Sequence, residues 1–292
     1  MSTLPLFSII IPTYNRCDKV CNAIDSVLAQ NFTDYELIIA DDGSTDNTRK
    51  MLETYSNRLH IIAIEHGGVS KARNAGIRAG DSKYVAFLDS DDVWRPEKLM
   101  AQAGFIQSNP KIRISQTDEM WIRNGQRVNP AVKHKKRSGD IFIDSLALCL
   151  ISPSAAVLER ELFNEFGMFD EEMPACEDYD LWLRILAHEP VGLIENTLTI
   201  RYAGHDDQLS QRFWGMDSFR LYSIIKLLRE NKQLKEEYSQ AANKSAKERC
   251  EILKGGAAKR DKTEFAKELE VILTLLIHED YSNINCQTLL AK

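Results

Sequence analysis

Two clusters of carboxylates directly follow apolar segments near the start of this 292-residue chain. The segment "ELIIA" (36–40) runs into Asp41 and Asp42, and "YVAFLD" (84–89) runs into the sequence "SDD". A carboxylate that is buried without a partner is costly, whereas one that faces a cation or a polar ligand is tolerated. The two clusters therefore indicate a site for a cation or a polar ligand.

The spacing of the carboxylates excludes one familiar kind of site. A calcium-binding EF-hand loop needs acidic residues at its first, third and fifth positions, a glycine at the sixth and a glutamate at the twelfth. Neither cluster has this pattern.

The segments around the clusters alternate between strand and helix patterns, which predicts an α/β fold with a mostly parallel central sheet flanked by helices. Ligands of such folds bind beyond the carboxyl ends of the strands, where both clusters lie. Strands are predicted at 6–11, 36–40, 59–65 and 84–89, and helices at 16–30, 45–55, 68–80 and 95–108.

The pattern changes after residue 110. Alternating residues predict two strands around a turn at Asn124-Gly125, and the last part of the chain is predicted to be a helical tail that is interrupted at Gly255-Gly256. The strands are expected within 113–125, 141–171 and 191–202, and the helices within 141–171, 177–188 and 214–292.

Five motifs, read in order, resemble the family 2 glycosyltransferases of the GT-A fold. They are "IIIPTYNR", "ADDGSTDNT", "GVSKARNAG", "FLDSDD" and "ACEDYDLWLR", and the resemblance covers about residues 6–212. It implies an inverting enzyme that moves a sugar from a nucleoside diphosphate sugar, with UDP-sugars favoured, to an acceptor hydroxyl. The acceptor would be a glycan, a lipid-linked sugar or another hydroxyl compound in cell-surface polysaccharide or glycolipid synthesis.

The resemblance also implies which residues bind the donor. Tyr14 would offer an aromatic face to the base, and Asp42 would accept a hydrogen bond from the base or ribose, with Asp41 as a structural partner. Arg73 follows the start of a helix, where a diphosphate would be favourable. The donor-binding set is Pro12, Thr13, Tyr14, Asp42, Arg73, Asp89 and Ser90.

The resemblance further implies a divalent metal ion, Mn²⁺ or Mg²⁺. Asp89 and Asp91 match the Asp-x-Asp motif of the family, in which the last aspartate usually holds the metal. Asp91 is therefore the expected ligand, and Asp89 is expected at the ribose or at a metal-bound water. His205, late in the chain, is expected at the metal or the diphosphate.

The general base is expected in the sequence "CEDYD". Inverting displacement needs a carboxylate opposite the leaving diphosphate, to accept the proton of the acceptor hydroxyl. Asp178 matches this role in the family, and Glu177 is the alternative. Asp180 is expected on the helix surface, and Trp182 in the core.

Candidates for contact with the acceptor lie in the middle of the chain. By resemblance, Ser152 and Ser154 would line the acceptor site, and Trp121 could stack on a sugar ring. The basic sequence "KHKKR" (133–137) is interpreted as a solvated loop, with contact to a diphosphate or an anionic acceptor as the alternative. The expected division is a donor-binding half (1–110), an acceptor-binding and catalytic half (111–212) and a helical extension (213–292).

Composition narrows the possible partners and location. The formal net charge of -6 argues against a nucleic-acid-binding protein, because such proteins carry basic surfaces. No segment approaches the roughly 20 apolar residues of a membrane span, and the apolar start ends at Pro12 without signal-peptide features. A cytoplasmic location is expected, which leaves contact with the inner face of a membrane and the oligomeric state undecided.

Two other functions are compatible with the fold class. A sugar-nucleotide nucleotidyltransferase would need a loop rich in glycine and lysine after the first strand, but "PTYNR" stands there. A non-catalytic binding module would be favoured by loss of the carboxylates, and all of them are present. A dinucleotide dehydrogenase is disfavoured because no G-x-G-x-x-G follows a strand.

Overall fold

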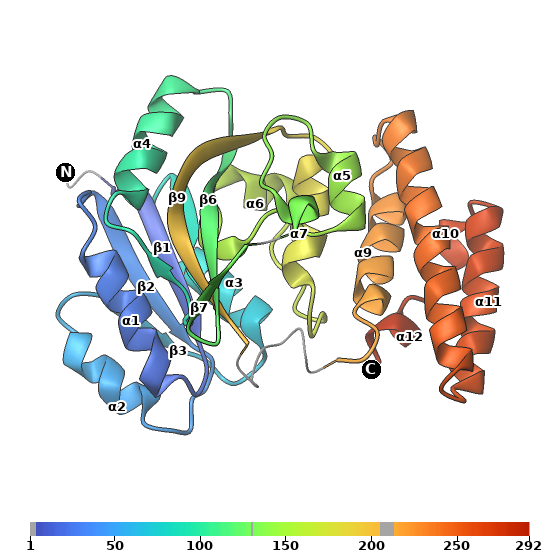
Figure 1. The fold of residues 1–292 in the computed structure, drawn as a ribbon, viewed down its shortest axis with the longest axis horizontal. Helices are drawn as coiled ribbons and strands as arrows, with labels where there is room; N and C mark the ends of the chain where they lie inside the picture. Colours follow the sequence, from blue (N-terminus) through green and yellow to red (C-terminus); the bar gives the residue numbers. More distant parts are fainter. Residues whose placement is uncertain (1–3, 130, 205–212, 292) are drawn as a thin grey trace. The chain divides into compact units, whose positions relative to one another are not determined.

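The computed structural model describes residues 4–129, 131–204 and 213–291, which form two compact units (Figure 1). We call them the sheet unit and the helical unit. The sheet unit contains residues 4–140, 150–171 and 189–204, and the helical unit contains residues 141–149, 172–188 and 213–291. The units divide the expected middle segment between them, so its functional boundaries stay a prediction.

The first four strands of the sheet unit are parallel, as the sequence predicts. They lie in the order β3-β2-β1-β4, so that β1 pairs with both β2 and β4. Their carboxyl ends therefore share one edge of the sheet. The strands are β1 (Phe7–Thr13), β2 (Tyr35–Asp41), β3 (His60–Ala63) and β4 (Tyr84–Phe87).

Alternate residues of β1 face different helices. Ile9 and Ile11 belong to a buried cluster with Ile24 of α1, whereas Ile10 lies against Gly76 of α3. Helices therefore cover both faces of this part of the sheet, which explains why β1 is apolar on both sides. The helices are α1 (Cys17–Leu28), α2 (Thr48–Leu52) with η1 (Glu53–Tyr55), α3 (Val69–Ala79) and α4 (Lys98–Ser108).

Gly76 allows the close approach of α3 to the sheet. A Cβ atom at this position would lie 2.4 Å from Cγ2 of Ile10, which is closer than real Cβ atoms come. The glycine therefore sets the distance between α3 and β1. This distance matters for the site because α3 carries Arg73.

The remaining strands complete a mixed sheet. β8 (Ala156–Glu159) runs antiparallel to β4, β6 (Ile114–Arg123) runs antiparallel to β8, and β9 (Val191–Ala203) runs parallel to β6. The expected hairpin turn at Asn124-Gly125 is confirmed, with φ angles of 50° and 75°. The other elements here are β5 (Val93–Trp94), β7 (Gln126–Val128), η2 (Val132–His134), η3 (Pro153–Ala155) and α6 (Glu161–Phe166).

The helical unit contains the expected helices of the tail. The prediction that Gly255-Gly256 interrupts them is wrong, because both glycines lie inside one long helix, α10 (Glu236–Ala258). Burial of neighbours such as Leu253 and Ala257 offsets the cost of about 1 kcal/mol that each helical glycine carries. The other helices are α5 (Phe142–Ala147), α7 (Glu177–Leu186), α9 (Asp217–Glu230), α11 (Thr263–Ile277), η4 (Tyr281–Asn283) and α12 (Gln287–Leu290).

None of the helices in the described part of the chain is long and apolar enough to cross a lipid bilayer. All six cysteines are free thiols.

Candidate functional site

The two aspartates that end β2 have different partners. Asp41 is fully buried, accepts a hydrogen bond from the Ser44 N–H at 3.0 Å and pairs with Arg49 at 2.8 Å. This geometry agrees with the structural role expected for Asp41. Its contacts fix the turn that begins the "DDGS" motif, so the backbone of the next residue is held in place.

Asp42 is bound by the segment that precedes α3. Its two carboxylate oxygens accept hydrogen bonds from the N–H groups of Gly67 and Gly68, at 2.8 and 2.9 Å. The Nδ1 atom of His66 lies 2.8 Å from Oδ2 of Asp42. Asp42 therefore joins the end of β2 to the start of α3, and its expected contact with a base or ribose stays a prediction.

Tyr14 stands at the exposed end of the "PTYN" motif. Its ring stacks on the imidazole of His66 with centroids 4.0 Å apart, and the residue is 36% exposed. Pro12 and Thr13, by contrast, are buried within β1. Among these three, Tyr14 alone presents a side chain that a base could contact. His66 was not identified from the sequence, because only the fold brings it to Tyr14.

Arg73 and Asp89 form an ion pair at the carboxyl ends of the strands. The guanidinium is almost buried on α3, and its Nη2 atom lies 2.7 Å from Oδ1 of Asp89. The same guanidinium lies over the ring of Phe169, 5.1 Å from its centroid. Arg73 is therefore held in a fixed orientation beside the loop of residues 89–92, which we call the carboxylate loop. Ser90 of this loop is buried.

The last aspartate of the loop, Asp92, is a structural residue that sequence reasoning did not single out. It is 3% exposed and accepts hydrogen bonds from the hydroxyl of Ser154 at 2.7 Å and the N–H of Tyr202 at 3.1 Å. Burial raises the pKa of Asp92, as do the charges of Asp91 and Asp89, whereas Arg201 opposes this shift. Asp92 thereby ties the carboxylate loop to β9.

Ser154 does not occupy the position expected of an acceptor-binding side chain. It is fully buried, and its hydroxyl also accepts the N–H of Asp89 at 3.1 Å. Both of these hydrogen bonds of the hydroxyl are to the carboxylate loop. The structure thus gives its side chain a supporting role and leaves it no exposed surface for an acceptor.

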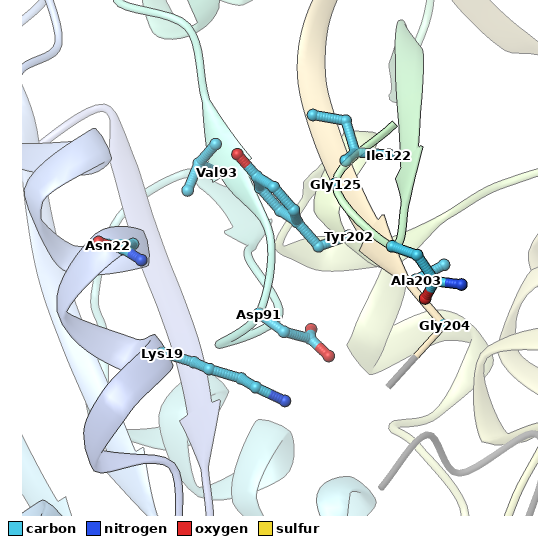
Figure 2. Close-up of a pocket in the computed structure, with 10 residues that line it drawn as sticks. Lys19, Asn22, Asp91, Val93, Ile122, Gly125, Tyr202, Ala203 and Gly204 are labelled. Atoms are coloured by element: carbon cyan, nitrogen blue, oxygen red, sulfur yellow. The ribbon is translucent and has the colours of Figure 1, made fainter. Parts of the chain in front are cut away.

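Asp91, like Asp89, is a partly exposed member of the carboxylate loop. Its side chain is 20% exposed, and its Oδ2 atom lies 3.9 Å from Nη1 of Arg16. Asp91 also lines a cavity of about 300 Å³ (Figure 2). Its accessible oxygens suit a hard cation such as Mg²⁺ or Mn²⁺. Among the described residues, no group of three or more His, Cys, Asp or Glu side chains is arranged to hold a metal ion, and His205 lies outside those residues.

A buried ionic cluster lies behind Trp121. Glu119 pairs with Lys136 at 3.2 Å and with Arg201 at 3.4 Å, and it accepts the indole N–H of Trp121 at 2.8 Å. Burial works to raise the pKa of Glu119, but Lys136 and Arg201 outweigh it and lower this pKa to about 2. Ser152 joins the cluster by accepting a hydrogen bond from Lys136 at 2.9 Å.

This cluster corrects the interpretation of the basic sequence 133–137. The segment is not solvated throughout, because Lys136 is only 6% exposed and donates to the backbone oxygen of Leu150. The other basic residues of the segment are half-buried or exposed. The pairing with Glu119 could not be recognised from a run of like charges.

The expected base candidates begin α7 in the helical unit. Glu177 is 6% exposed, whereas Asp178 is half-buried. Asp178 accepts the N–H of Tyr179 at 2.7 Å and lies 3.6 Å from Sγ of Cys149. Burial raises the pKa of the neighbouring Cys176 thiol to about 12, so Cys176 stays protonated at neutral pH.

Asp180 and Trp182 also lie on α7, and they were expected on the helix surface and in the core, respectively. Trp182 is 2% exposed, which confirms its place in the core. The prediction for Asp180 is wrong, since it is 1% exposed and pairs with Arg184 at 2.8 Å and Lys226 at 3.5 Å. Lys226, the partner on α9, lies far from Asp180 in the sequence. The charge pattern of α7 alone therefore could not reveal this ion pair.

Comparison with known families and proteins is consistent with this arrangement. The model of the family described as "Glycosyl transferase family 2" matches residues 8–167, which is more than half of the chain. The chain is 34% identical, over 191 residues, to the Escherichia coli protein WfgD, named a UDP-Glc:alpha-D-GlcNAc-diphosphoundecaprenol beta-1,3-glucosyltransferase. That match covers 65% of this chain and 73% of WfgD.

A second relative is an uncharacterized glycosyltransferase, RP339, of Rickettsia prowazekii. It is 33% identical over 185 residues, a match that covers 62% of this chain and 58% of RP339. The chain thus spans less than two thirds of the length of this relative.

Two solved structures have the same fold. Residues 1–349 of TarS from S. aureus, in complex with UDP-GlcNAc, match with a TM-score of 0.63 at 18% identity, covering 95% of this chain and 89% of that one. The mannosyltransferase PcManGT from Pyrobaculum calidifontis, in complex with GDP-Man and Mn²⁺, matches with a TM-score of 0.58 at 15% identity, covering 98% and 88%. The expected GT-A fold is thereby confirmed.

Proposed function

Because the chain belongs to glycosyl transferase family 2, we propose that it transfers a sugar from a nucleoside diphosphate sugar to an acceptor hydroxyl with inversion. The observation that carries this proposal is the grouping of Asp42, Arg73, Asp89 and Asp91 around the carboxyl ends of β1, β2 and β4. Nucleotide ligands bind at this edge in open α/β sheets.

We propose a uridine nucleotide as the donor, on the basis of two similar proteins. WfgD is named for UDP-Glc, and the TarS structure contains UDP-GlcNAc. In this chain Tyr14 would contact the base and Asp42 the base or ribose. Arg73 would contact the diphosphate by exchanging part of its pairing with Asp89 for the ligand, which keeps the guanidinium paired throughout.

A divalent ion at Asp91 completes the proposed donor site. PcManGT was solved with Mn²⁺, and the partly exposed carboxylate of Asp91 offers the oxygen ligands that such an ion takes. When bound, the ion would neutralise charge on the leaving diphosphate. His205 is proposed as a further contact of the ion or the diphosphate.

Asp178 is proposed as the general base. The start of a helix is a favourable place for negative charge, and a carboxylate can accept the proton of an acceptor hydroxyl. Asp178 is more exposed than Glu177, which favours it over its neighbour. Ser152 and Trp121 are proposed near the acceptor, and Trp121 would present an indole that is held at its N–H by Glu119.

The acceptor is proposed to belong to cell-surface polysaccharide or glycolipid synthesis, in the cytoplasm or at the inner face of the membrane. WfgD is named for a lipid-linked acceptor, and TuaG of Bacillus subtilis, 29% identical over 214 residues, for teichuronic acid biosynthesis. These names support the class of acceptor and leave the individual sugar and linkage to experiment.

A panel of UDP-, GDP- and dTDP-sugars tests the proposal. Thermal unfolding with Mn²⁺ present should show a rise in Tm with one nucleotide class, and hydrolysis of that donor should depend on the metal. A nucleotidyltransferase would instead release pyrophosphate from a nucleoside triphosphate and a sugar phosphate. Stabilisation by a nucleotide sugar without hydrolysis or transfer to any glycan acceptor would point to a binding module.

A further inference from the structure

Of the described residues proposed above for the donor site, only Asp91 lines the cavity of about 300 Å³. Neither Tyr14, Asp42 nor Arg73 lines it, so the expected contacts with base, ribose and diphosphate lie elsewhere. Its walls come from α1, the carboxylate loop with β5, the β6–β7 turn and the end of β9 (Figure 2). The lining residues are Lys19, Asn22, Asp91, Val93, Ile122, Asn124, Gly125, Tyr202, Ala203 and Gly204.

One part of the cavity is apolar. Val93, Ile122 and the ring of Tyr202 line it from three different strands, and Figure 2 shows their side chains on one side of the cavity. Tyr202 remains 40% exposed although its N–H is fixed by Asp92. A large aromatic side chain that stays accessible on a backbone held in place offers a surface for apolar contact.

The other part of the cavity is charged. Lys19 extends from α1 toward the side that Asp91 lines (Figure 2), and these two are the only charged side chains among the lining residues. Their charges sum to about zero at neutral pH. A divalent ion on Asp91 would bring the sum to about +2. With metal bound, this end of the cavity would attract an anion.

An end that attracts anions beside an apolar wall favours a ligand with both an anionic group and a hydrocarbon part. A phosphate group matches the ammonium of Lys19 and the amide of Asn22, and a hydrocarbon chain matches Val93, Ile122 and Tyr202. A free sugar carries neither the negative charge that would match Lys19 nor the hydrocarbon chain that would match the apolar wall. The cavity adjoins the proposed metal ligand, so a ligand held there would lie next to the donor diphosphate.

We propose that this cavity binds the acceptor through a phosphate group and the isoprenoid-like hydrocarbon attached to it. The inference rests on the proposed glycosyl transfer and specifies that the acceptor, whose hydroxyl receives the sugar, is linked to a lipid through phosphate. Lys19 would contact the phosphate, and Ile122 and Tyr202 the chain. The name of WfgD includes a diphosphate-linked lipid acceptor, which fits this chemistry.

Binding of farnesyl phosphate, used below its critical micelle concentration, tests the proposal. Calorimetric titration would be run with Mn²⁺ and saturating UDP, so that the donor site is already filled. Farnesol supplies the hydrocarbon alone, and inorganic phosphate supplies the anion alone. We expect farnesyl phosphate to bind at least about tenfold more tightly than either, which corresponds to about 1.4 kcal/mol.

Three variants locate the binding site. Lys19→Met and Ile122→Ser should each weaken the binding of farnesyl phosphate by about tenfold. Lys50→Met, an exposed change on α2 away from the cavity, is the matched control and should have no effect. The affinity for UDP should be equal in all three variants.

The outcomes separate this inference from the donor proposal. If UDP binds but farnesyl phosphate binds no better than phosphate or farnesol, the cavity is not a lipid-phosphate site while the donor site stands. The same follows if the Lys19 and Ile122 variants match the control. If UDP-sugar affinity falls in these variants instead, the cavity holds the donor sugar. If UDP itself does not bind, the proposed function fails independently of the cavity.

Discussion

Cys149 places its Sγ atom 3.6 Å from Oδ2 of Asp178. The other oxygen of this carboxylate accepts the N–H of Tyr179, the next residue of α7, at 2.7 Å. A thiol is a weak hydrogen-bond donor, so Oδ2 keeps most of its capacity to accept a proton. The carboxylate thus makes a strong contact at one oxygen and a weak contact at the other.

Replacement of Asp178 by Asn should abolish most turnover. Asparagine keeps the shape and one acceptor oxygen but cannot accept the proton of the acceptor hydroxyl. Since a positioned general base contributes about 10²–10⁴-fold, kcat should fall by at least about 10²-fold, with the affinities for nucleotide and metal nearly unchanged. Steady-state kinetics and calorimetric titration with UDP measure the two quantities.

Glu177→Gln is the matched control for this change. Glu177 is 6% exposed, so it is expected to act in the packing of α7 and not on substrate. Loss of turnover in Glu177→Gln but not in Asp178→Asn would identify Glu177 as the base. Full activity of both variants would argue against an inverting mechanism that uses this pair.

Replacement of Asp91 by Asn should weaken nucleotide binding that depends on metal. The neutral amide is a poorer ligand for a hard cation, so the affinity for UDP in Mn²⁺ should fall by at least about tenfold. Asp46→Asn is the control, because Asp46 accepts the N–H of Thr48 at the start of α2 and lies outside the carboxylate loop. Equal titration curves for the two variants, or binding of UDP to Asp91→Asn in chelator that is as tight as that of the wild-type protein in Mn²⁺, would remove Asp91 as the ligand.

Stability should rise with pH because of Lys98. This lysine is fully buried, donates to the Ala155 oxygen at 3.0 Å, and has its pKa lowered to about 7 by burial, with a smaller effect of Lys136. Between about pH 7 and 10.5 the unfolded chain holds a proton that the folded chain lacks. The free energy of unfolding should therefore increase by up to about 1.4 kcal/mol per pH unit in this window, and decrease as the pH falls toward 7.

Urea unfolding of Lys98→Met at pH values from about 7 to 9.5, inside this window, measures the contribution of Lys98 to the pH dependence of the free energy of unfolding. The variant should lack the slope that Lys98 adds, so its difference from the wild-type protein changes steadily with pH. Lys50→Met, at an exposed position, should keep the wild-type slope. Parallel curves for wild type and Lys98→Met would mean that Lys98 stays charged in the folded protein.

Two glycine-to-alanine changes should have opposite effects on stability. Gly76→Ala places a methyl group against Ile10 and should destabilise the fold by about 1–3 kcal/mol. Gly104 lies in α4, where an added Cβ atom would meet no other atom within 4 Å, so Gly104→Ala should stabilise by about 0.5–1 kcal/mol. Chemical denaturation compares them, and destabilisation of similar size in both would contradict the packing argument.

The sequence predicts the parallel strands and their helices well because each carries its own periodic apolar pattern. Ile9 and Ile11, for example, belong to one buried cluster. The two-residue strand β5 has no such pattern, since it exists only through pairing with β9. The helix through Gly255 and Gly256 was missed for a related reason, because tertiary packing outweighs the local preference of glycine.

Site residues can be predicted from the sequence where they belong to a motif of adjacent residues. They cannot be predicted where their role depends on a contact with a residue that is distant in the sequence. The carboxylates at strand ends were recognised from the sequence, but the supporting contact of Asp92 joins it to Ser154, 62 positions away. Likewise, Lys136 belongs to a run of basic residues in the sequence and to a buried ion pair in the fold. Polar groups that the fold buries in pairs have no signature in one sequence.

The contacts of Ser154 also constrain how such enzymes can be recombined. A chimera that joined residues 1–110 of this chain to the remainder of a relative would separate Asp89 and Asp92 from the serine that binds them both. If the relative lacked a hydroxyl there, the buried carboxylate of Asp92 would lose a partner. Exchange of acceptor specificity should therefore transplant residues around 202 and leave the carboxylate loop and Ser154 from one parent.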